Sequence, residues 1–469
     1  MQSILDAQRA AFMAELPVTV AARRDRLRRA IAMLMGNQQR FCDALCDDFG
    51  HRSQEQSLLT DIAASIAPLR HALKQLDRWS RPEKKPVLFP LGLLGGRAWV
   101  EYQPKGVVGI IAPWNFPVNL VMSPLAGVLA AGNRAMMKTS EFTPRVAALF
   151  EELGARYFDA SEVAFVSGGA EVGKAFAALP FDHLLFTGAT GIGRHILHAA
   201  ADNLTPVTLE LGGKSPVILG RSADIARATE RVVIGKMLNA GQICLAPDYL
   251  LVPADREEAV VAGLQAAASA QYPTLLANTD YTAIINDRHH ERLTGWIEDA
   301  RAKGAEVIVV NPANEDFAGS NSRKLPLHII RGATDAMTVM QEEIFGPILP
   351  IRSYDTIDDA IAEVNRRDRP LALYHFGTDE AERRRLLDRT ISGGVTLDDV
   401  VFHVSQEELP FGGIGPSGMG AYHGEAGFRT FSHARSIYRQ PKIDVARLAG
   451  LKPPYGAATR RSIAKQIKG

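Results

Sequence analysis

The sequence predicts an α/β protein whose first half forms a doubly wound parallel sheet. Apolar runs of strand length alternate with helical patterns from about residue 103 to residue 213. The run at residues 106–112 is continuous, as in a strand that is buried on both faces. Strands that alternate with helices imply right-handed crossovers and a parallel sheet. A second α/β pattern follows Gly213, so we expect two α/β domains.

Length and composition agree with a large two-domain protein. The 469 residues are 46% hydrophobic, which is enough for extensive cores. The formal net charge of +1 gives no field that favours nucleic acid or a membrane surface. Three cysteines predict a reducing compartment rather than a disulfide framework. Residues 1–15 lack a signal-peptide pattern, and the longest apolar stretch, residues 118–131, is too short for a bilayer, so we expect a cytoplasmic protein.

The first 80 residues predict helices, because Leu27, Ile31 and Leu34 recur at near-helical spacing. An arginine cluster surrounds them: Arg23, Arg24, Arg26, Arg28 and Arg29. Such a cluster is either an anion-binding patch or, as we expect here, a solvated helix face. Prolines and glycines between residues 82 and 96 break the pattern, and residues 99–102 predict a short strand. We therefore expect a connector or an extension that leaves the main body.

The two α/β patterns define the remaining elements and the domain boundaries. In the first pattern we expect strands at residues 106–112, 134–138, 163–166, 183–186 and 206–211, with helices from 118, 144, 171 and 191. In the second we expect strands at 216–219, 249–252, 306–310, 327–330 and 348–353, with helices at 224–238, 258–268 and 288–303. The predicted units are a first domain (1–82 and 103–213), a second domain (214–395), a small β arm (83–102 and 396–440) and a tail (441–469).

Two residues are candidates for covalent chemistry. Cys244 follows a Gly-Gln pair in a weakly polar run, and Glu210 interrupts an apolar stretch that ends in two glycines. A thiolate attacks a carbonyl carbon, and a carboxylate takes a proton from the thiol or from water. For each residue alone, a buried structural cysteine and a salt-bridged glutamate are the alternatives.

Several polar residues and a glycine turn follow the strands of the first domain. Trp114, Asn115 and Lys138 lie at or just after strand ends, where doubly wound sheets bind ligands. The turn at residues 186–193 opens a helix, so its N–H groups suit a pyrophosphate, although a plain strand-to-helix turn fits equally well. The literal G-x-G-x-x-G at residues 413–418 lies near the chain end, outside a βαβ unit. We interpret it as a tight, backbone-crowded loop.

Taken together, these segments resemble the NAD(P)-dependent aldehyde dehydrogenase superfamily. Six motifs occur in the family's order: Pro113-Trp114-Asn115-Phe116-Pro117, Lys138-Thr139-Ser140-Glu141, Phe186-Thr187-Gly188, Leu209-Glu210-Leu211-Gly212-Gly213-Lys214, Gly241-Gln242-Ile243-Cys244 and Glu342-Glu343-Ile344-Phe345-Gly346-Pro347. Residues 246–249 and 410–424 are similar to the class 3 branch, and within it the chain looks most like coniferyl aldehyde dehydrogenases. The resemblance implies a dinucleotide-binding first domain, a catalytic second domain and an arm that bridges subunits.

The resemblance also implies catalytic roles for Cys244, Glu210 and Asn115. Cys244 would add to the aldehyde carbon and form a thiohemiacetal. The Asn115 amide and the Cys244 N–H would hold the oxyanion, and one such donor contributes roughly 3–4 kcal/mol. Hydride would pass to the nicotinamide, and Glu210 would activate the water that releases the acid from the thioester.

The resemblance assigns the dinucleotide site to further residues and implies no metal. Lys138 and Glu141 match contacts to the adenosine ribose, and a carboxylate at Glu141 favours NAD over NADP, although the class 3 branch accepts both. Glu343 and Phe345 match contacts near the nicotinamide. The other predicted cofactor residues are Trp114, Thr187, Gly188 and Gly193.

Two positions complicate this assignment. Glu342 competes with Glu343 for the same role, since the two carboxylates are adjacent. Ala189 stands where many members carry a serine, so a side-chain hydrogen bond to phosphate is lost.

The substrate follows from apolar residues near the predicted site. If Phe116, Asn119, Met122 and Met237 line the access tunnel, it suits aromatic or medium-chain aldehydes. The class 3 resemblance further implies a homodimer, and the balanced charge predicts no nucleic acid or membrane as partner.

Two other functions fit parts of the sequence. A thiol hydrolase would act on esters or amides without a nucleotide, and Lys138 with the glycine turn argues against it. A non-catalytic binding protein would need neither Cys244 nor Glu210. Glu210 also favours water over coenzyme A as the acyl acceptor.

Overall fold

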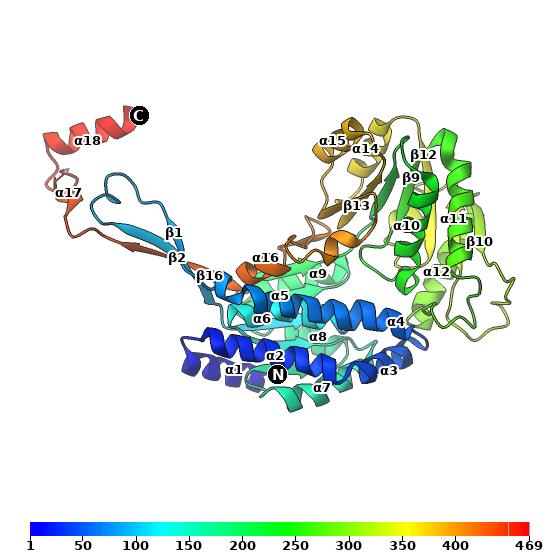
Figure 1. Cartoon of the computed structure of the whole chain (residues 1–469), viewed down its shortest axis with the longest axis horizontal. Coiled ribbons are helices and arrows are strands. Elements are labelled where there is room, and N and C mark those ends of the chain that lie inside the picture. Colours follow the sequence, from blue (N-terminus) through cyan, green and yellow to red (C-terminus); the bar gives the residue numbers. More distant parts are fainter. Residues whose placement is uncertain (449, 469) are drawn as a thin grey trace.

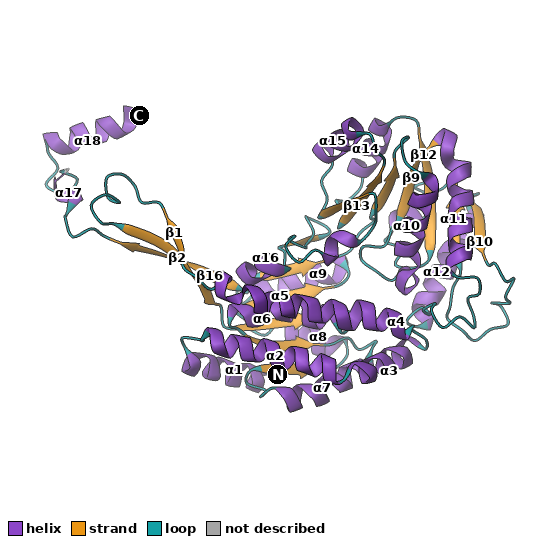
Figure 2. Cartoon of the chain, in the orientation of Figure 1, coloured by secondary structure: helices purple, strands orange, loops and turns teal. Residues whose placement is uncertain are grey.

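The computed structural model describes residues 1–448 and 450–468 and has two α/β bodies and a projecting arm. In Figure 1 the first body lies below the second, and the arm extends to one side and ends beside the C-terminus. Figure 2 shows that helices enclose the strands of both bodies. The predicted α/β class, with parallel sheets and a small β arm, is confirmed.

The first body is organised around a six-stranded sheet in the order β15-β7-β6-β3-β4-β5. All neighbouring strands are parallel except β15, which runs antiparallel to β7. The strands are β3 (Val107–Ile111), β4 (Arg134–Lys138), β5 (Val163–Val166), β6 (His183–Thr187), β7 (Val207–Glu210) and β15 (Gly418–Met419). Every residue of β3, β4 and β6 is buried, as expected for a central parallel sheet.

Helices of the first body come from both ends of the chain. The crossover helices are α6 (Asn119–Ala131), α7 (Pro144–Tyr157), α8 (Ala170–Ala177) and α9 (Thr190–Ala201). The N-terminal helices are α1 (Gln2–Glu15), α2 (Val20–Gly36), α3 (Gln38–Phe49), α4 (Gln54–Ser57), a π-helical turn η1 (Leu58–Ala63) and α5 (Ala64–Trp79), and α16 (Gly424–Thr430) joins them. The β3-to-β7 series thus matches the predicted order of strands.

The second body contains a seven-stranded sheet in the order β10-β11-β12-β9-β8-β13-β14, in which only β10 is antiparallel to its neighbour. The strands are β8 (Pro216–Leu219), β9 (Tyr249–Pro253), β10 (Glu306–Val310), β11 (Leu327–Arg331), β12 (Ile348–Tyr354), β13 (Ala372–Phe376) and β14 (Gly394–Leu397). Its helices are α10 (Ile225–Met237), η2 (Leu238–Gly241), η3 (Ala254–Arg256), α11 (Glu257–Gln271), α12 (Asp287–Ala302), α13 (Thr338–Gln341), α14 (Ile357–Arg366), α15 (Glu380–Arg389) and η4 (Phe402–Ser405).

The arm is a three-stranded antiparallel sheet made from two distant segments. It contains β1 (Glu83–Lys85), β2 (Arg97–Pro104) and β16 (Ser432–Arg439) in that order, followed by α17 (Val445–Leu448) and α18 (Ala457–Lys468). β2 is longer than the predicted strand because β16 pairs with it over its whole length. Of residues 396–440, only β16 belongs to this sheet, while β15 and α16 pack on the first body.

The arginine cluster of α2 differs from the solvated face that we expected. Arg23 and Arg26 are buried, and Arg26 binds Glu15 at 2.6 Å and Glu162 at 3.0 Å. Arg29 also binds Glu162, at 2.8 Å. The expectation was wrong for these residues because their partners lie on other elements, which the local pattern does not reveal.

Across the described residues, none of the helices is both long and apolar enough to cross a membrane.

Candidate active site

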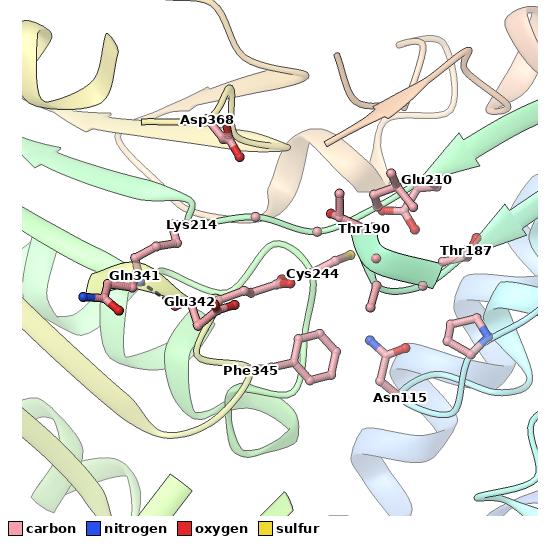
Figure 3. A pocket seen from close by; sticks show the side chains of 18 of the residues that line it. Asn115, Thr187, Thr190, Glu210, Lys214, Cys244, Gln341, Glu342, Phe345 and Asp368 are labelled. Atoms are coloured by element: carbon pink, nitrogen blue, oxygen red, sulfur yellow. Dashed lines mark hydrogen bonds between the residues drawn. The ribbon is translucent and has the colours of Figure 1, made fainter. Parts of the chain in front are cut away.

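A cavity of about 1020 Å³ lies between the two α/β bodies, at the carboxyl edge of the first sheet. Its walls come from the loop after β3, the turn after β6, the end of β7, the loop that carries Cys244, and the segment after α13. Eight of the predicted site residues line it: Trp114, Asn115, Thr187, Gly188, Glu210, Cys244, Glu343 and Phe345. Figure 3 shows the Cys244 sulfur directed into the space that Glu210, Thr187 and Asn115 border.

Cys244 reaches the cavity because the chain reverses sharply after α10. Asn239, Ala240 and Gly241 have φ angles of 52°, 51° and 75°, which is the left-handed region. This conformation is costly for the two non-glycine residues, so surrounding bonds must hold it. Gln242 provides them, since its side-chain Nε2 donates to Asn239 O and Ala283 O and its Oε1 accepts from Ile285 N. Gly241 is also required sterically, because a Cβ there would lie 2.4 Å from Gly346 O.

Glu210 ends β7 and is almost completely buried, with 1% of its surface exposed. Within the part of the chain that the structure describes, neither of its carboxylate oxygens has a hydrogen-bond partner. Burial therefore raises the pKa of Glu210 to about 8, although the nearby Cys244 and Thr187 act in the opposite direction. A carboxyl group with a pKa near neutrality can both accept and release a proton.

The Cys244 thiol is held in its neutral form by the same environment. Burial raises the pKa of Cys244, and the carboxyl groups of Glu210 and Glu343 raise it further. A thiol in this setting needs a neighbouring base before it can act as a nucleophile. Glu210 is a group of that kind on the same cavity, and its charge raises the pKa of Cys244 more than the charge of Glu343 does.

Asn115 lies on the loop between β3 and α6, and its side chain is 3% exposed. Its Nδ2 donates to Gln242 O at 3.1 Å, two residues before Cys244. An amide nitrogen carries two N–H groups, and Gln242 O is its only bonded acceptor among the described residues. The second N–H is therefore available to a ligand beside the thiol.

Glu343 packs its carboxylate on the glycine pair after β7. A Cβ at Gly212 would lie 2.2 Å from Glu343 Oε2, and the Gly213 N–H donates to this carboxylate. Burial, helped by the charge of Asp248, raises the pKa of Glu343 to about 8. Glu342 also lines the cavity but is exposed, and its backbone O accepts from Lys214 Nζ at 2.9 Å.

Two aromatic rings line the same cavity. Trp114 and Phe345 make an edge-to-face contact with centroids 5.3 Å apart. Phe345 adopts a φ of 50°, so its ring is presented by a strained backbone. The pair forms an apolar wall next to the polar Glu343 side.

Lys138, Glu141 and Gly193 do not belong to the residues that line this cavity. Lys138 is buried, and its Nζ donates to Glu141 Oε2 at 2.8 Å. Gly193 lies inside α9, and a Cβ there would approach Leu211 Cδ2 to 2.8 Å. These residues thus form contacts beside the cavity that shape its sheet edge.

None of the four residues expected to line an access tunnel lines this cavity. Met122 and Met237 are buried at 0% and 2% exposure, while Phe116 and Asn119 lie elsewhere. The neighbouring Leu120 lines it instead.

The glycine-rich stretch at 413–418 is a crowded loop, as predicted, since a Cβ at Gly413 would lie 1.9 Å from Ser417 O.

Several cavity residues from the second body were not predicted from the sequence. His289 and Arg292 project from α12, Arg366 ends α14, and Arg367 and Asp368 follow it. The His289 ring makes a tilted contact with Trp114, with centroids 5.2 Å apart, and burial lowers the pKa of His289 to about 4. Both helices have ordinary amphipathic patterns, so nothing local distinguished these residues.

The side chains present suit a dinucleotide. The cavity joins the N-terminus of α9, with Arg194 one turn into that helix, to the Glu343 carboxylate and the Trp114–Phe345 wall. N–H groups and an arginine suit phosphates, a carboxylate suits ribose hydroxyls, and aromatic rings suit a planar heterocycle. No group of three potential metal ligands occurs in residues 1–448 and 450–468.

The first sheet is doubly wound and has a thiol, a buried carboxyl group and a cavity that suits a dinucleotide at its edge. This combination is typical of nucleotide-dependent dehydrogenases that use a cysteine nucleophile. The profile of the aldehyde dehydrogenase family matches residues 1–437, and the chain belongs to this family. It is therefore an enzyme that oxidises aldehydes with NAD(P) as electron acceptor.

Individual relatives agree with this assignment. The chain is 56% identical to the probable coniferyl aldehyde dehydrogenase of Caulobacter vibrioides, over 100% of this chain and 97% of the relative. It is 52% identical to the coniferyl aldehyde dehydrogenase of Pseudomonas sp. strain HR199, over 97% and 94%. The solved structure of Staphylococcus aureus AldH in a substrate-bound state superposes with a TM-score of 0.92 at 33% identity, covering 99% of each chain. The predicted resemblance to the class 3 branch and to coniferyl aldehyde dehydrogenases is confirmed.

Proposed function

We propose that Cys244, Glu210 and Asn115 carry out the oxidation of an aromatic aldehyde, such as coniferyl aldehyde, or of a medium-chain aldehyde to the carboxylic acid. The observation that carries this proposal is the position of the Cys244 thiol and the unpartnered Glu210 carboxyl on one cavity. The names of the two relatives above support an aromatic substrate.

In the proposed first step, Glu210 takes the thiol proton, directly or through water, and the Cys244 sulfur forms a bond to the aldehyde carbon. The carbonyl π electrons move to the oxygen, which accepts hydrogen bonds from the Asn115 Nδ2 and the Cys244 N–H. Such donors stabilise the oxyanion strongly because they are already in position when its negative charge develops. When bound, the nicotinamide supplies the hydride acceptor for this carbon.

Before the proposed second step, Glu210 releases the thiol proton to solvent. It then removes a proton from water that attacks the resulting thioester. The carbon–sulfur bond breaks, the acid leaves, and the sulfur regains a proton. Glu210 therefore acts twice as a base, which fits a pKa of about 8.

For the cofactor, we propose that Glu343 binds ribose hydroxyls, that Phe345 and Trp114 flank the nicotinamide, and that Thr187 and Gly188 border the pyrophosphate. Gly193 would let α9 approach the sheet closely enough for this. Lys138 and Glu141 would bind the adenosine ribose. Burial opposes ionisation of Glu141, but the hydrogen bond from Lys138 lowers its pKa, so a charged carboxylate would repel a 2′-phosphate and favour NAD over NADP.

The central test replaces the nucleophile. Cys244→Ala should lose aldehyde-dependent NADH formation while still quenching protein fluorescence on addition of NAD. Full turnover by this variant would contradict the proposal.

For the substrate, kcat/KM across an aldehyde panel should favour coniferyl and other apolar aldehydes, and a preference for small charged semialdehydes would refute the substrate class.

We further propose that the chain is a homodimer joined through its arm. The arm projects from the body, and Leu88, Phe89 and Leu93 on it are each about four-fifths exposed (Figure 1). β14 and β16 each end a sheet within the described residues, so each offers a free edge for pairing. Light scattering should give twice the chain mass for the native protein and less for Phe89→Asp.

The domain division and the cellular location are proposals of the same kind. We propose a dinucleotide-binding domain (1–82 and 103–213), a catalytic domain (214–395), a bridging segment (83–102 and 396–440) and a tail (441–469). Within the bridging segment β16 belongs to the arm sheet, while β15 and α16 lie on the first body. The sheet pairings support the first two units. A working thiol at Cys244 favours a reducing, cytoplasmic location, which cell fractionation would test.

A further inference from the structure

Arg52 and Asp61 form a fully buried ion pair behind the loop that carries Asn115. Arg52 Nη2 lies 2.6 Å from Asp61 Oδ2, and both side chains are 0% exposed. Asp61 belongs to the π-helical turn η1, and Arg52 precedes α4. A buried ion pair is weak evidence for stability, because well-packed apolar residues of similar size often stabilise a fold as well or better. Its contacts with the site are therefore the more informative feature.

The pair holds both ends of the short segment between Asn115 and α6. Arg52 Nη1 donates to Asn115 O at 2.9 Å. Asp61 Oδ1 accepts from Val118 N at 3.1 Å and from Asn119 N at 3.3 Å, which are N–H groups at the start of α6. One ion pair thus fixes the carbonyl of Asn115 and the helix that follows it.

The guanidinium of Arg52 has little freedom to move. Its carbon Cζ lies 4.6 Å from the Phe49 ring centroid and 5.2 Å from that of Phe116. A planar guanidinium can contact two rings while two of its nitrogens donate, which a lysine ammonium cannot reproduce.

The same carbonyl connects Asn115 to the loop that carries the thiol. Asn239 Nδ2 donates to Asn115 O and to Gln242 O, both at 3.1 Å. Asn115 Nδ2 donates to that same Gln242 O at 3.1 Å. The direction of the Asn115 amide is therefore set by a carbonyl acceptor on one side and by its own anchored backbone on the other.

We propose that the Arg52–Asp61 pair is a positioning device that aims the Asn115 amide at the oxyanion next to Cys244. Neither residue lines the cavity, so neither touches substrate or cofactor. The inference rests on the proposed role of Asn115 as an oxyanion donor and adds the residues that make this role possible.

The test compares Arg52→Met and Arg52→Lys in the native background and in an Asn115→Ala background. Removing one oxyanion donor lowers kcat about 100- to 1000-fold, so loosening it should lower kcat roughly 10- to 100-fold. KM and the NAD dissociation constant, measured by fluorescence quenching, should change less than about threefold. In the Asn115→Ala background, the same Arg52 change should lower kcat by less than about threefold, because the amide that it positions is gone.

Arg26→Met is the matched control. Arg26 is also buried and is paired with Glu15 and Glu162. None of these three residues lines the cavity. Its loss should lower the melting temperature without changing kcat per folded molecule. All rates are normalised to titrated thiol and to the near-ultraviolet circular dichroism of the full chain.

Asp61→Asn provides a variant that keeps an oxygen for the α6 N–H groups and should fold even if Arg52→Met does not. It should lower kcat about three- to tenfold in the native background alone. The inference is overturned if the Arg52 and Asp61 variants keep kcat within threefold, or lose the same factor in both backgrounds. A failure of the proposed function would look different, because native protein would then lack aldehyde-dependent NADH formation or Cys244→Ala would retain it.

Discussion

Asp61 and Glu210 are two buried carboxyl groups in the first body. They differ in their surroundings and, we infer, in their function. Asp61 has an arginine partner at 2.6 Å and two backbone N–H donors. Glu210 has no hydrogen-bond partner among the described residues. Burial penalises a charged carboxylate unless other groups compensate for the lost water. Burial raises the pKa of both groups. At Asp61 the Arg52 charge and two backbone N–H donors oppose this effect, so Asp61 acts as a fixed structural acceptor. At Glu210 only the Cys244 and Thr187 side chains oppose it, so Glu210 is free to exchange a proton.

The largest expected effect separates activity from stability at Glu210. Glu210→Gln removes the base but keeps the shape, so kcat should fall roughly 100- to 10,000-fold. The melting temperature should stay the same or rise, because no partner is lost and an uncompensated carboxyl disappears. NADH absorbance and calorimetry measure the two quantities. A marked loss of stability would show that Glu210 has a structural partner after all.

At Asp61 the larger expected effect is on stability. Asp61→Leu leaves Arg52 as an unpaired buried charge, so the free energy of unfolding should fall by about 3–5 kcal/mol. Urea unfolding followed by fluorescence measures this loss, with Asp77→Leu as an exposed control that should change little, because Asp77 is largely in solvent. Equal losses for the two variants would remove the distinction between the buried carboxyl groups.

The pH dependence sharpens the comparison further. The pKa of Glu210 is raised to about 8, so its basic form increases as pH rises, and kcat should grow about tenfold between pH 7 and pH 9. Stability should change in the opposite direction. The folded protein keeps a proton that the unfolded chain loses above about pH 4.5, so the free energy of unfolding falls by about 1.4 kcal/mol per pH unit up to pH 8 for each such group.

Glu343, whose pKa is also raised to about 8, contributes with the same sign. Glu210→Gln should therefore remove its own contribution, about 1.4 kcal/mol per pH unit, from the slope between pH 5 and pH 8. Melting temperatures across this range test the point, and an unchanged slope would place the titrating groups elsewhere.

The smallest effect concerns a third carboxyl group, which is paired but partly exposed. Glu141→Gln weakens its bond to Lys138 and removes its negative charge. The ratio of kcat/KM for NADP to that for NAD should rise severalfold, on the order of tenfold at most, because a charge–charge repulsion near solvent is modest. Steady-state kinetics with both nucleotides measure the ratio, and Glu342→Gln serves as a control on the other side of the cavity.

The candidate site could be predicted largely where its chemistry is local in the sequence. Cys244 and Glu210 each lie in a short stretch whose residue types depart from their surroundings, and the alternation of strands and helices predicted the first sheet. Arg52 and Asp61 could not be predicted, because each is an ordinary polar residue until the fold brings it to Asn115, more than 50 positions away. The buried Arg26 was misjudged for the same reason, since Glu162 lies 136 residues along the chain.

The two-residue strand β15 has a consequence for how the enzyme matures. It pairs with the end of β7, where Gly418 faces Glu210, and Ser417 O accepts from Leu211 N at 3.1 Å. The base of the site is thus supported by a segment that leaves the ribosome some two hundred residues after it. A nascent chain that stops short of this segment would hold its thiol and its carboxyl, yet would lack the backbone that braces one of them.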